Sequence, residues 1–489
     1  MKSDRTADQM AGFAEFATET LATWHVPSAA VAVVKDGEVV LAEGFGVRTV
    51  PDGAPVNGLT LFAIGSCTKA FTGTSLGILV DDGKLDLDRP VREYLPEFRM
   101  HDPVASERIT PRDLVCHRSG LPGHNSMWHH APCTRGELLH RIRYLEPSAD
   151  FRAAYQYQNL MFMAAGCLLE RVSGRTWEEF VQQRILDPLG MSRTNFSVRA
   201  SQASGNFAAP CHEKGGEVME VPLTNIDAIG PAGSINSCAA DMAQWLLLNL
   251  NKGRHGARQI ISERAFREIH SPQMVVSEPL MHPELLYSSY GMGWIIQPYR
   301  GRLLVRHGGR IRGFSAMTSF MPHDNIGVSA LSTVDIPTVP VPTILTYQVY
   351  ERLLGLDRTP WGSRLTKEYE DLQKATEEAH STVRAQRTAG THLSHSLADY
   401  IGDFEHPGYG VVSIEAAEGG LQATFHGTTY PLDHCHYDSF EMAGDAFETR
   451  MTVSFFTDVQ GRIASLAIPF EPAVAPIRFT RTPPGGPHQ

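Results

Sequence analysis

One short stretch decides how this chain folds and works: Phe62-Ala63-Ile64-Gly65-Ser66-Cys67-Thr68-Lys69-Ala70-Phe71-Thr72. It places the hydroxyl of Ser66 and the amine of Lys69 three residues apart, where a helix is expected to begin. Because positions i and i+3 share a helix face, a partly desolvated Lys69 can accept the Ser66 proton. The pair therefore predicts a serine nucleophile activated without histidine, whereas a plain helix N-cap is the alternative for Ser66.

Two further motifs follow in a fixed order along the chain. Tyr157-Gln158-Asn159 comes first, and His307-Gly308-Gly309 stands well beyond it, before Phe314-Ser315-Ala316. Together with the Ser-Lys pair, they resemble the Ser-x-x-Lys, Tyr-x-Asn and Lys/His-x-Gly elements of the serine β-lactamase and penicillin-binding-protein superfamily. The resemblance implies an α/β fold, in which an antiparallel sheet is flanked by helices and joined to an all-helical lobe.

The same resemblance implies a role for each residue of these motifs. Ser66 would be the nucleophile and Lys69 its general base. Tyr157 would relay the proton to the leaving group, although core packing is the alternative for an aromatic residue. Asn159 would hold the Lys69 amine and the substrate amide through its two-sided side chain, with a helix N-cap as the alternative.

The third motif departs from the commonest pattern of the superfamily. His307 stands where β-lactamases mostly carry a cationic lysine, and a histidine is largely neutral at pH 7. A histidine at this position is closer to the pattern of the D-aminopeptidase, esterase and amidase branches than to that of enzymes that bind a free carboxylate. Gly308 and Gly309 would let an extended substrate lie against the strand, and the backbone N–H groups of Ser66 and Arg310 would form the oxyanion hole.

Other segments are weaker candidates. Trp128 can line a binding groove, with packing as an equal alternative. Arg312 can reach the mouth of the cleft, although paired arginines are usually solvated. The segments Cys116-His117-Arg118-Ser119-Gly120-Leu121-Pro122 and Gly230-Pro231-Ala232-Gly233 are familiar from the superfamily and are interpreted as loop architecture.

Composition narrows the partners. The 489 residues include 43 basic and 54 acidic ones, a net charge of -11. An acidic chain without basic runs is a poor partner for nucleic acid or an anionic membrane. The seven cysteines are an odd number without Cys-x-x-Cys spacing, and the first 26 residues are polar. Both features lead us to expect free thiols and a cytoplasmic location.

Apolar spacing predicts how the chain is organised. Residues 9–24, 158–172 and 241–250 have helical spacing, and residues 30–34, 38–42, 303–306, 315–321 and 326–332 read as strands. The third motif is then expected at a strand edge or strand end. We expect a catalytic domain over 1–355, a charged helical linker over 356–390 and a small closed barrel over 391–489, which resembles the lipocalin-like module of superfamily relatives.

No cofactor or metal is expected. The 21 histidines form no His-Glu-x-x-His motif, and neither paired cysteine knuckles nor a glycine-rich phosphate loop occur in the sequence. A Gly-x-Ser-x-Gly elbow is also missing, which argues against the usual α/β-hydrolase.

Within this superfamily, the sequence resembles the penicillin-binding-protein-type thioesterases. This resemblance implies that a peptidyl thioester, carried on the phosphopantetheine arm of a carrier protein, forms an ester on Ser66. An internal amine then releases it as a ring, with a D-residue at the acyl end. A D-stereospecific aminopeptidase, amidase or esterase with the same residues is the first alternative, and a non-catalytic peptide or β-lactam sensor is the second.

Overall fold

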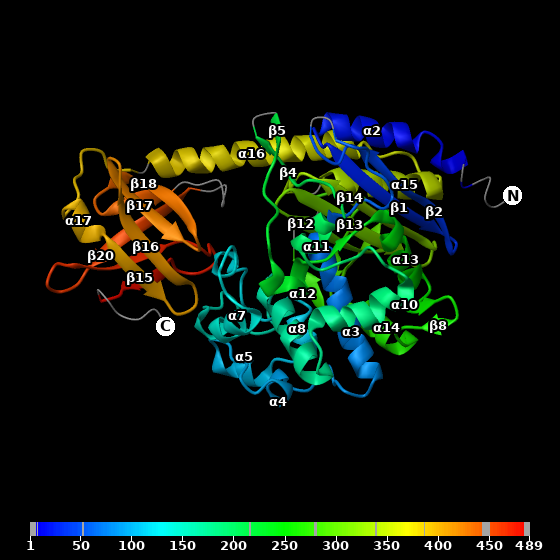
Figure 1. Ribbon diagram of the computed structural model, residues 1–489, viewed down its shortest axis with the longest axis horizontal. Helices are drawn as coiled ribbons and strands as arrows, with labels where there is room; N and C mark the ends of the chain where they lie inside the picture. The colour runs from blue at the N-terminus through cyan, green and yellow to red at the C-terminus, as the bar shows by residue number, and fades with distance from the viewer. Residues whose placement is uncertain are drawn as a thin grey trace.

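The computed structural model describes residues 6, 8–50, 53–214, 217–277, 281–337, 340–385, 387–442 and 450–483. It confirms the expected fold class: a sheet with helices on both faces, and a closed barrel near the end of the chain. The long helix α16 (Trp361–Ala385) runs from the first body to the barrel (Figure 1). Within the described ranges, none of the helices combines the length and apolar character needed to cross a bilayer.

The central sheet has eight antiparallel strands, whose order brings both ends of the first 354 residues together. In spatial order the strands are β2 (Glu38–Gly46), β1 (Ser28–Lys35), β14 (Ile326–Thr333), β13 (Phe314–Met321), β12 (Arg302–Ile311), β11 (Ile295–Tyr299), β10 (Ser288–Tyr290) and β9 (Met274–Val276). In the described residues, three two-stranded sheets lie outside it: β3 (Phe62–Ala63) with β6 (Asn236–Ser237), β4 (Cys211–Lys214) with β5 (Glu217–Glu220), and β7 (Arg254–His255) with β8 (Arg258–Gln259).

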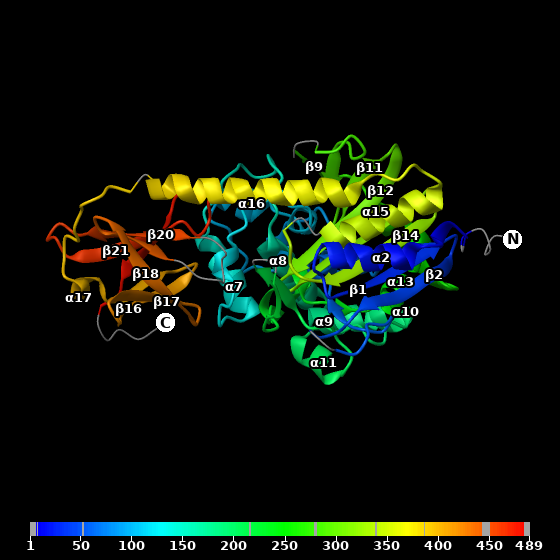
Figure 2. The ribbon, with the colours of Figure 1, turned by 90° about the horizontal axis from the view of Figure 1, so that it is seen from above.

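Helices cover both faces of the sheet. The outer face carries α2 (Phe13–Thr23) and α15 (Pro340–Leu354), which lie beside α16 in Figure 2. The helical lobe and its connections comprise α3 (Thr68–Asp81), α4 (Val91–Tyr94), α5 (Pro103–Arg108), α6 (Pro111–Leu114), α7 (Arg135–Arg141), α8 (Asn159–Ser173), α9 (Trp177–Val181), α10 (Asp187–Leu189), α11 (Val198–Ala203), α12 (Gly230–Gly233), α13 (Ala239–Leu250) and α14 (Glu263–Ile269).

Strand β1 divides the core into two halves. Because successive strand residues point to opposite faces, Ala30, Ala32 and Val34 join the core beneath the helical lobe. Ala29, Val31 and Val33 join a second core against α2 and α15. A strand buried on both faces explains why its sequence is apolar without alternation.

Helix α3 is the central element of the lobe. Its residues from Thr68 to Leu79 are all buried, so it is surrounded on every side. Small residues allow this close packing: a Cβ on Gly73 would lie 2.2 Å from the carbonyl oxygen of Met292. The ring of Phe71 stacks on Trp245 of α13 at 3.8 Å. The helix that starts at the Ser-Lys pair is thereby fixed in the middle of the domain.

Strand β12 carries the third motif, but not at its end. His307, Gly308 and Gly309 lie inside the strand, because pairing with β13 continues to Ile311↔Phe314. Strand β11 pairs with β12 only as far as Arg306, so from His307 onward this side of β12 is open. The motif therefore lies at a local edge of the sheet, within an otherwise interior strand.

The barrel contains eight strands, and the sequence pattern predicts four of them, in residues 400–404, 409–414, 421–425 and 451–456. They are β15 (Gly402–His406), β16 (Gly410–Ala417), β17 (Gly420–Phe425), β18 (Thr428–His436), β19 (Ser439–Met442), β20 (Met451–Thr457), β21 (Ile463–Ile468) and β22 (Ile477–Arg481). Pairing of β15 with β22 closes the barrel. The short helix α17 (Leu397–Tyr400) precedes it. Closure removes the exposed strand edges that a small sheet would otherwise present.

Candidate active site

Ser66 lies on a tight turn at the start of α3. Gly65 opens the 3-10 turn η1 (Gly65–Cys67) with a φ of +50°, a conformation that favours glycine. A Cβ at Gly65 would lie 2.8 Å from the backbone nitrogen of Arg310, so the turn presses directly on β12. Ser66 is half-buried and stands at the positive end of the helix dipole, where a developing oxyanion is stabilised.

The amine of Lys69 has three polar neighbours. Its Nζ lies 2.9 Å from Oγ of Ser66, 2.7 Å from Oδ1 of Asn159 and 2.8 Å from the carbonyl oxygen of Ala232. The last two can only accept hydrogen bonds. A neutral amine has two protons for these acceptors and one lone pair, which then faces the Ser66 hydroxyl.

Burial favours this neutral form of Lys69. Its side chain is fully buried, and desolvation lowers the pKa well below the ordinary value of 10.5. The neighbouring Cys67 would oppose this if it were charged, but burial raises its own pKa to about 12, so the thiol stays neutral. Cys67 instead donates to the carbonyl of His307 at 3.2 Å. Lys69 is thus poised as a base.

The carbonyl of Ala232 is a site component that sequence reasoning treated as loop architecture. Thr72, one turn beyond Lys69 on α3, donates to the carbonyl of Pro231 at 2.7 Å. Thr72 in turn accepts a hydrogen bond from Nε1 of Trp177 at 3.0 Å. These contacts fasten α12 against α3 and direct the Ala232 carbonyl at the amine. A backbone acceptor leaves no residue-specific signal, so only the structure reveals it.

Tyr157 comes to the same place. Nζ of Lys69 lies 4.8 Å from the centre of its ring. Desolvation raises the pKa of the phenol, and a hydrogen bond with Ser66 only partly opposes the rise. About 37% of Tyr157 is still exposed, so the residue borders solvent. The phenol thus stays protonated and adjoins both Ser66 and Lys69.

Asn159 faces the amine and is not the helix cap. The N-cap of α8 is Gln158, whose side chain accepts from the N–H of Leu160 at 2.7 Å. Asn159 is the first helical residue and gives Oδ1 to Lys69. Its Nδ2 donates to Oδ1 of Asn125 at 3.3 Å. Asn125 belongs to none of the sequence motifs, and it sets which end of the Asn159 amide meets the lysine.

His307 is buried and neutral. Its Nδ1 lies 2.6 Å from the carbonyl oxygen of Gly308 and must donate, so Nε2 accepts from the hydroxyl of Tyr290 at 2.8 Å. Desolvation by burial lowers the pKa of His307 to about 3, and a charge on Lys69 would act in the same direction. The position that is cationic in many relatives of the superfamily therefore carries no charge here. Its ring centre lies 6.3 Å from that of Tyr157.

Gly309 has a packing role that the expectation did not include. A Cβ on Gly309 would lie 1.9 Å from the carbonyl oxygen of Ile64. Gly309 is therefore needed so that β12 can approach the nucleophile turn, and it is buried. Substrate contact by Gly308 and Gly309 stays a prediction. Gly308 is half-buried. The contact of Gly65 with the Arg310 backbone brings the Arg310 N–H next to the Ser66 turn, where an oxyanion hole is expected.

The two weaker candidates lie on separate elements. Trp128 is half-buried at the end of the turn η2 (Asn125–Met127), and its ring lies 4.1 Å from that of His129 at an angle of 32°. Arg312 lies beyond the end of β12, where it lines an apolar pocket together with Phe196, Leu223, Ile226 and Phe314. The role of Trp128 and Arg312 as substrate contacts stays a prediction.

His117 is a further residue that motif reasoning did not select. It is fully buried with a φ of +59°, and its Nδ1 accepts from the N–H of Gln158 at 3.0 Å. Its ring centre lies 4.3 Å from that of Tyr157 and 4.5 Å from that of Tyr290. Desolvation lowers the pKa of His117 well below its ordinary value. The neutral ring of His117 thus packs against the rings of both tyrosines.

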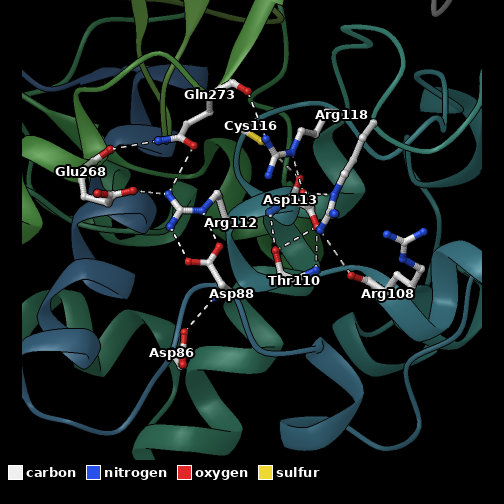
Figure 3. A network of polar contacts seen from close by, with 11 residues as sticks. Asp86, Asp88, Arg108, Thr110, Arg112, Asp113, Cys116, Arg118, Glu268 and Gln273 are labelled. Carbon is white, nitrogen blue, oxygen red and sulfur yellow. Dashed lines mark hydrogen bonds and ion pairs between the residues drawn. The ribbon is translucent and has the colours of Figure 1, made fainter.

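A buried ion-pair network holds the segment around His117 in place (Figure 3). The carboxylate of Asp113 is fully buried and pairs with Arg118 at 2.5 Å and with Arg152 at 2.7 Å. The backbone N–H of Arg152 donates to the backbone carbonyl of Arg118, which joins the two loop segments that carry these arginines. Burial raises the pKa of Asp113, but the hydrogen bond from Arg152 and the charge of Arg118 outweigh it, so the net pKa is lowered.

Replacing Asp113 with asparagine should destabilise the fold by about 3 kcal/mol, the low end for a broken buried ion pair, because Arg152 reaches solvent. The folded-state pKa of Asp113 is depressed, so its contribution is present above the ordinary pKa of 3.8 and disappears as the pH falls through the folded value. Urea unfolding at pH 7 measures the loss. Asp88→Asn is the control and should cost under about 1 kcal/mol, because the Asp88 carboxylate is exposed and Arg112 keeps its ion pair with Glu268.

The fold and the contact between Ser66 and Lys69 are those expected of a serine enzyme that transfers acyl groups. Residues 13–349 match the family described as Beta-lactamase, and the chain belongs to that family. It is a serine hydrolase or acyltransferase of the β-lactamase superfamily. Residues 386–481 match a domain of unknown function, DUF3471, which covers the barrel.

Relatives extend the match over the whole chain. The chain is 30% identical over 470 residues to "Unguisins hydrolase ungD'" of Aspergillus campestris, covering 90% of this chain and 84% of that protein. It is 28% identical to "Unguisins hydrolase ungD" of Aspergillus violaceofuscus, covering 96% and 85%. Both alignments therefore include at least part of the barrel.

Solved structures share the fold. A penicillin-binding protein homologue from Pyrococcus abyssi superposes with a TM-score of 0.61 at 22% identity, over 96% of this chain and all of that one. The D-amino acid amidase from Ochrobactrum anthropi superposes with a TM-score of 0.60 at 20% identity, over 71% of this chain and 98% of that one. At these identities the likeness concerns the fold.

Proposed function

We propose that this protein hydrolyses a peptide bond or peptide ester through an acyl intermediate on Ser66. The observation that carries the proposal is the set of contacts around Nζ of Lys69, which leaves a lone pair facing the Ser66 hydroxyl. Lys69 takes the hydroxyl proton as Oγ attacks the carbonyl carbon, and Tyr157 protonates the leaving group. Water then attacks the ester and releases the acid.

The nature of the substrate follows from charge and similarity. A neutral His307 offers no cation to a free carboxylate, so we propose an acyl chain that is recognised by its backbone along the open edge of β12. The names of the two Aspergillus relatives support hydrolysis as the outcome. The exposed side of Tyr157 supports it too, because water can reach the ester there.

Ring closure of a peptidyl thioester, delivered by a carrier protein, uses the same acyl intermediate and stays a prediction. In that reaction an amine of the acyl chain replaces water as the nucleophile, and the thiol departs. The D-configuration of the acyl residue likewise rests on the sequence resemblance. We place hydrolysis first because the site is open to solvent.

One experiment separates these outcomes. Peptides ending in a D-residue are offered as the amide and as the N-acetylcysteamine thioester, and the products are weighed by mass spectrometry. Free acid from both substrates supports hydrolysis, whereas a product lighter by one water than that acid indicates ring closure. Ser66→Ala is the control and should release neither. Failure of a fluorophosphonate probe to label Ser66 of the wild type would contradict both hydrolysis and ring closure, and it would favour a non-catalytic peptide or β-lactam sensor.

A further inference from the structure

The interior of the barrel is filled by aromatic side chains. Phe425 stacks on Phe470 at 4.7 Å, and Tyr409 stacks on Phe470 at 5.7 Å. Phe479 packs edge-on against the same ring at 6.0 Å. Such packing is that of a core and not of a ligand-binding cup. The contribution of the barrel is therefore sought at the surface where it meets the catalytic domain.

That contact is made of polar groups around one loop of the catalytic domain. The hydroxyl of Tyr409 lies 2.7 Å from Nδ1 of His124. The carboxylate of Glu471 accepts the backbone N–H of His124, also at 2.7 Å. A third contact joins Nδ1 of His426 to the carbonyl oxygen of His129 at 2.8 Å. The barrel thus holds the loop from His124 to His129 by both backbone and side chain.

The proton positions in this contact are fixed by its partners. Nε2 of His124 lies 2.9 Å from the carbonyl oxygen of Glu146 and must donate to it. Nδ1 therefore accepts, and the Tyr409 hydroxyl donates. Burial lowers the pKa of His124 and raises that of Tyr409, so both groups are neutral. The loss of one hydroxyl would leave a buried acceptor without its partner.

His124 has an unfavourable backbone conformation that these contacts maintain. Its φ of 44° and ψ of 38° lie in the left-handed region, which costs a residue with a side chain about 1 kcal/mol or more. The residue is fully buried and directly precedes η2, whose first member is Asn125. The turn at His124 thus sets the direction in which Asn125 projects.

Asn125 links this loop to the catalytic amine. Its Oδ1 accepts from Nδ2 of Asn159, and Oδ1 of Asn159 accepts from Lys69. Because an amide has a donor end and an acceptor end, an Asn159 side chain without this partner is free to turn its NH2 toward the lysine. That orientation would offer Lys69 a donor where it needs an acceptor.

We propose that the barrel orients the active site, with Tyr409 and Glu471 acting as positioning residues that hold His124 so that Asn125 fixes the Asn159 amide. The inference rests on the proposed function, since it concerns the rate at which Ser66 becomes acylated. It gives the barrel a catalytic consequence without any contact with the substrate.

The test is a double-mutant cycle on the acylation rate, measured with a chromogenic ester or a fluorophosphonate probe. Tyr409→Phe and Asn125→Ala should each slow acylation about tenfold, as expected for one lost hydrogen bond in a positioning chain. If Tyr409 acts through Asn125, the double variant should also be slowed only about tenfold. A loss of about a hundredfold in the double variant would mean independent effects and would overturn the inference.

A matched control separates positioning from loss of barrel stability. Tyr400→Phe removes another barrel hydroxyl, which donates to Asp438 within the barrel, and should leave the acylation rate unchanged. Hydrogen exchange provides a readout without turnover: amides of residues 123–129 should exchange faster in Tyr409→Phe than in Tyr400→Phe. Equal exchange in the two variants overturns the inference, whereas a wild type that is never acylated overturns the proposed function alone.

Discussion

Lys69→Met should lower the rate of Ser66 acylation by about ten-thousandfold, the upper range for losing a general base. Methionine fills a similar volume but has no lone pair basic enough to take the Ser66 proton. The wild-type rate should already level off well below pH 10.5, because desolvation lowers the pKa of Lys69, and should fall as the pH drops through that lowered value. Stopped-flow acylation across pH measures both effects.

Stability provides the internal check on the same variant. The unfolded chain binds a proton at Lys69 below pH 10.5, whereas the folded chain does not until the pH is much lower. The wild type therefore gains stability relative to Lys69→Met as the pH rises through this window. As the pH rises toward 10, the melting temperature of the wild type should increase relative to that of Lys69→Met. Lys35→Met, at a half-buried lysine of β1 that pairs with Asp36, should show no such trend, and a parallel pH dependence in both variants would contradict a neutral Lys69.

The Ser-Lys pair could be predicted because its contact is local. Residues three apart on a helix meet whatever the rest of the fold does, and the apolar neighbours indicated burial. Tyr157 and His307 could be placed only by the order of motifs, since their approach to Ser66 and Lys69 depends on how β12 and the segment around His117 pack. The predicted neutrality of His307 agrees with its burial, but its partner Tyr290 could not be foreseen, because Tyr290 lies in a short strand with no motif.

Contacts between distant loops were beyond sequence reasoning. Glu471 and His124 are 347 residues apart, and neither lies in a motif. Strand β18 was missed for a local reason. Pro431 lies within it and is a turn signal, and the bulge between His434 and His436 interrupts the alternation of its side chains. Barrel closure supplies the pairing that overrides them. Period-2 patterning therefore identified the barrel but only half of its strands.

Tyr157→Phe should slow acylation by about a thousandfold with a peptide amide and by about tenfold with the matching thioester. An amide nitrogen departs only after it gains a proton, and the phenol is the group beside Ser66 that can supply it. A thiolate leaves without prior protonation, so the thioester depends less on Tyr157. Rates with paired substrates of one acyl chain measure the difference.

The protonation state of the phenol makes this prediction specific. Desolvation raises the pKa of Tyr157, so the phenol keeps its proton throughout the neutral range. The Tyr157→Phe variant should therefore show the same fall of the acylation rate at low pH, which Lys69 sets. Tyr350→Phe is the matched control: it removes a buried hydroxyl that bonds Ser319 on the other face of the sheet, and should alter neither rate. Equal losses of amide and thioester activity in Tyr157→Phe would mean that the phenol positions Ser66 or Lys69. Unequal losses assign it the proton of the leaving group.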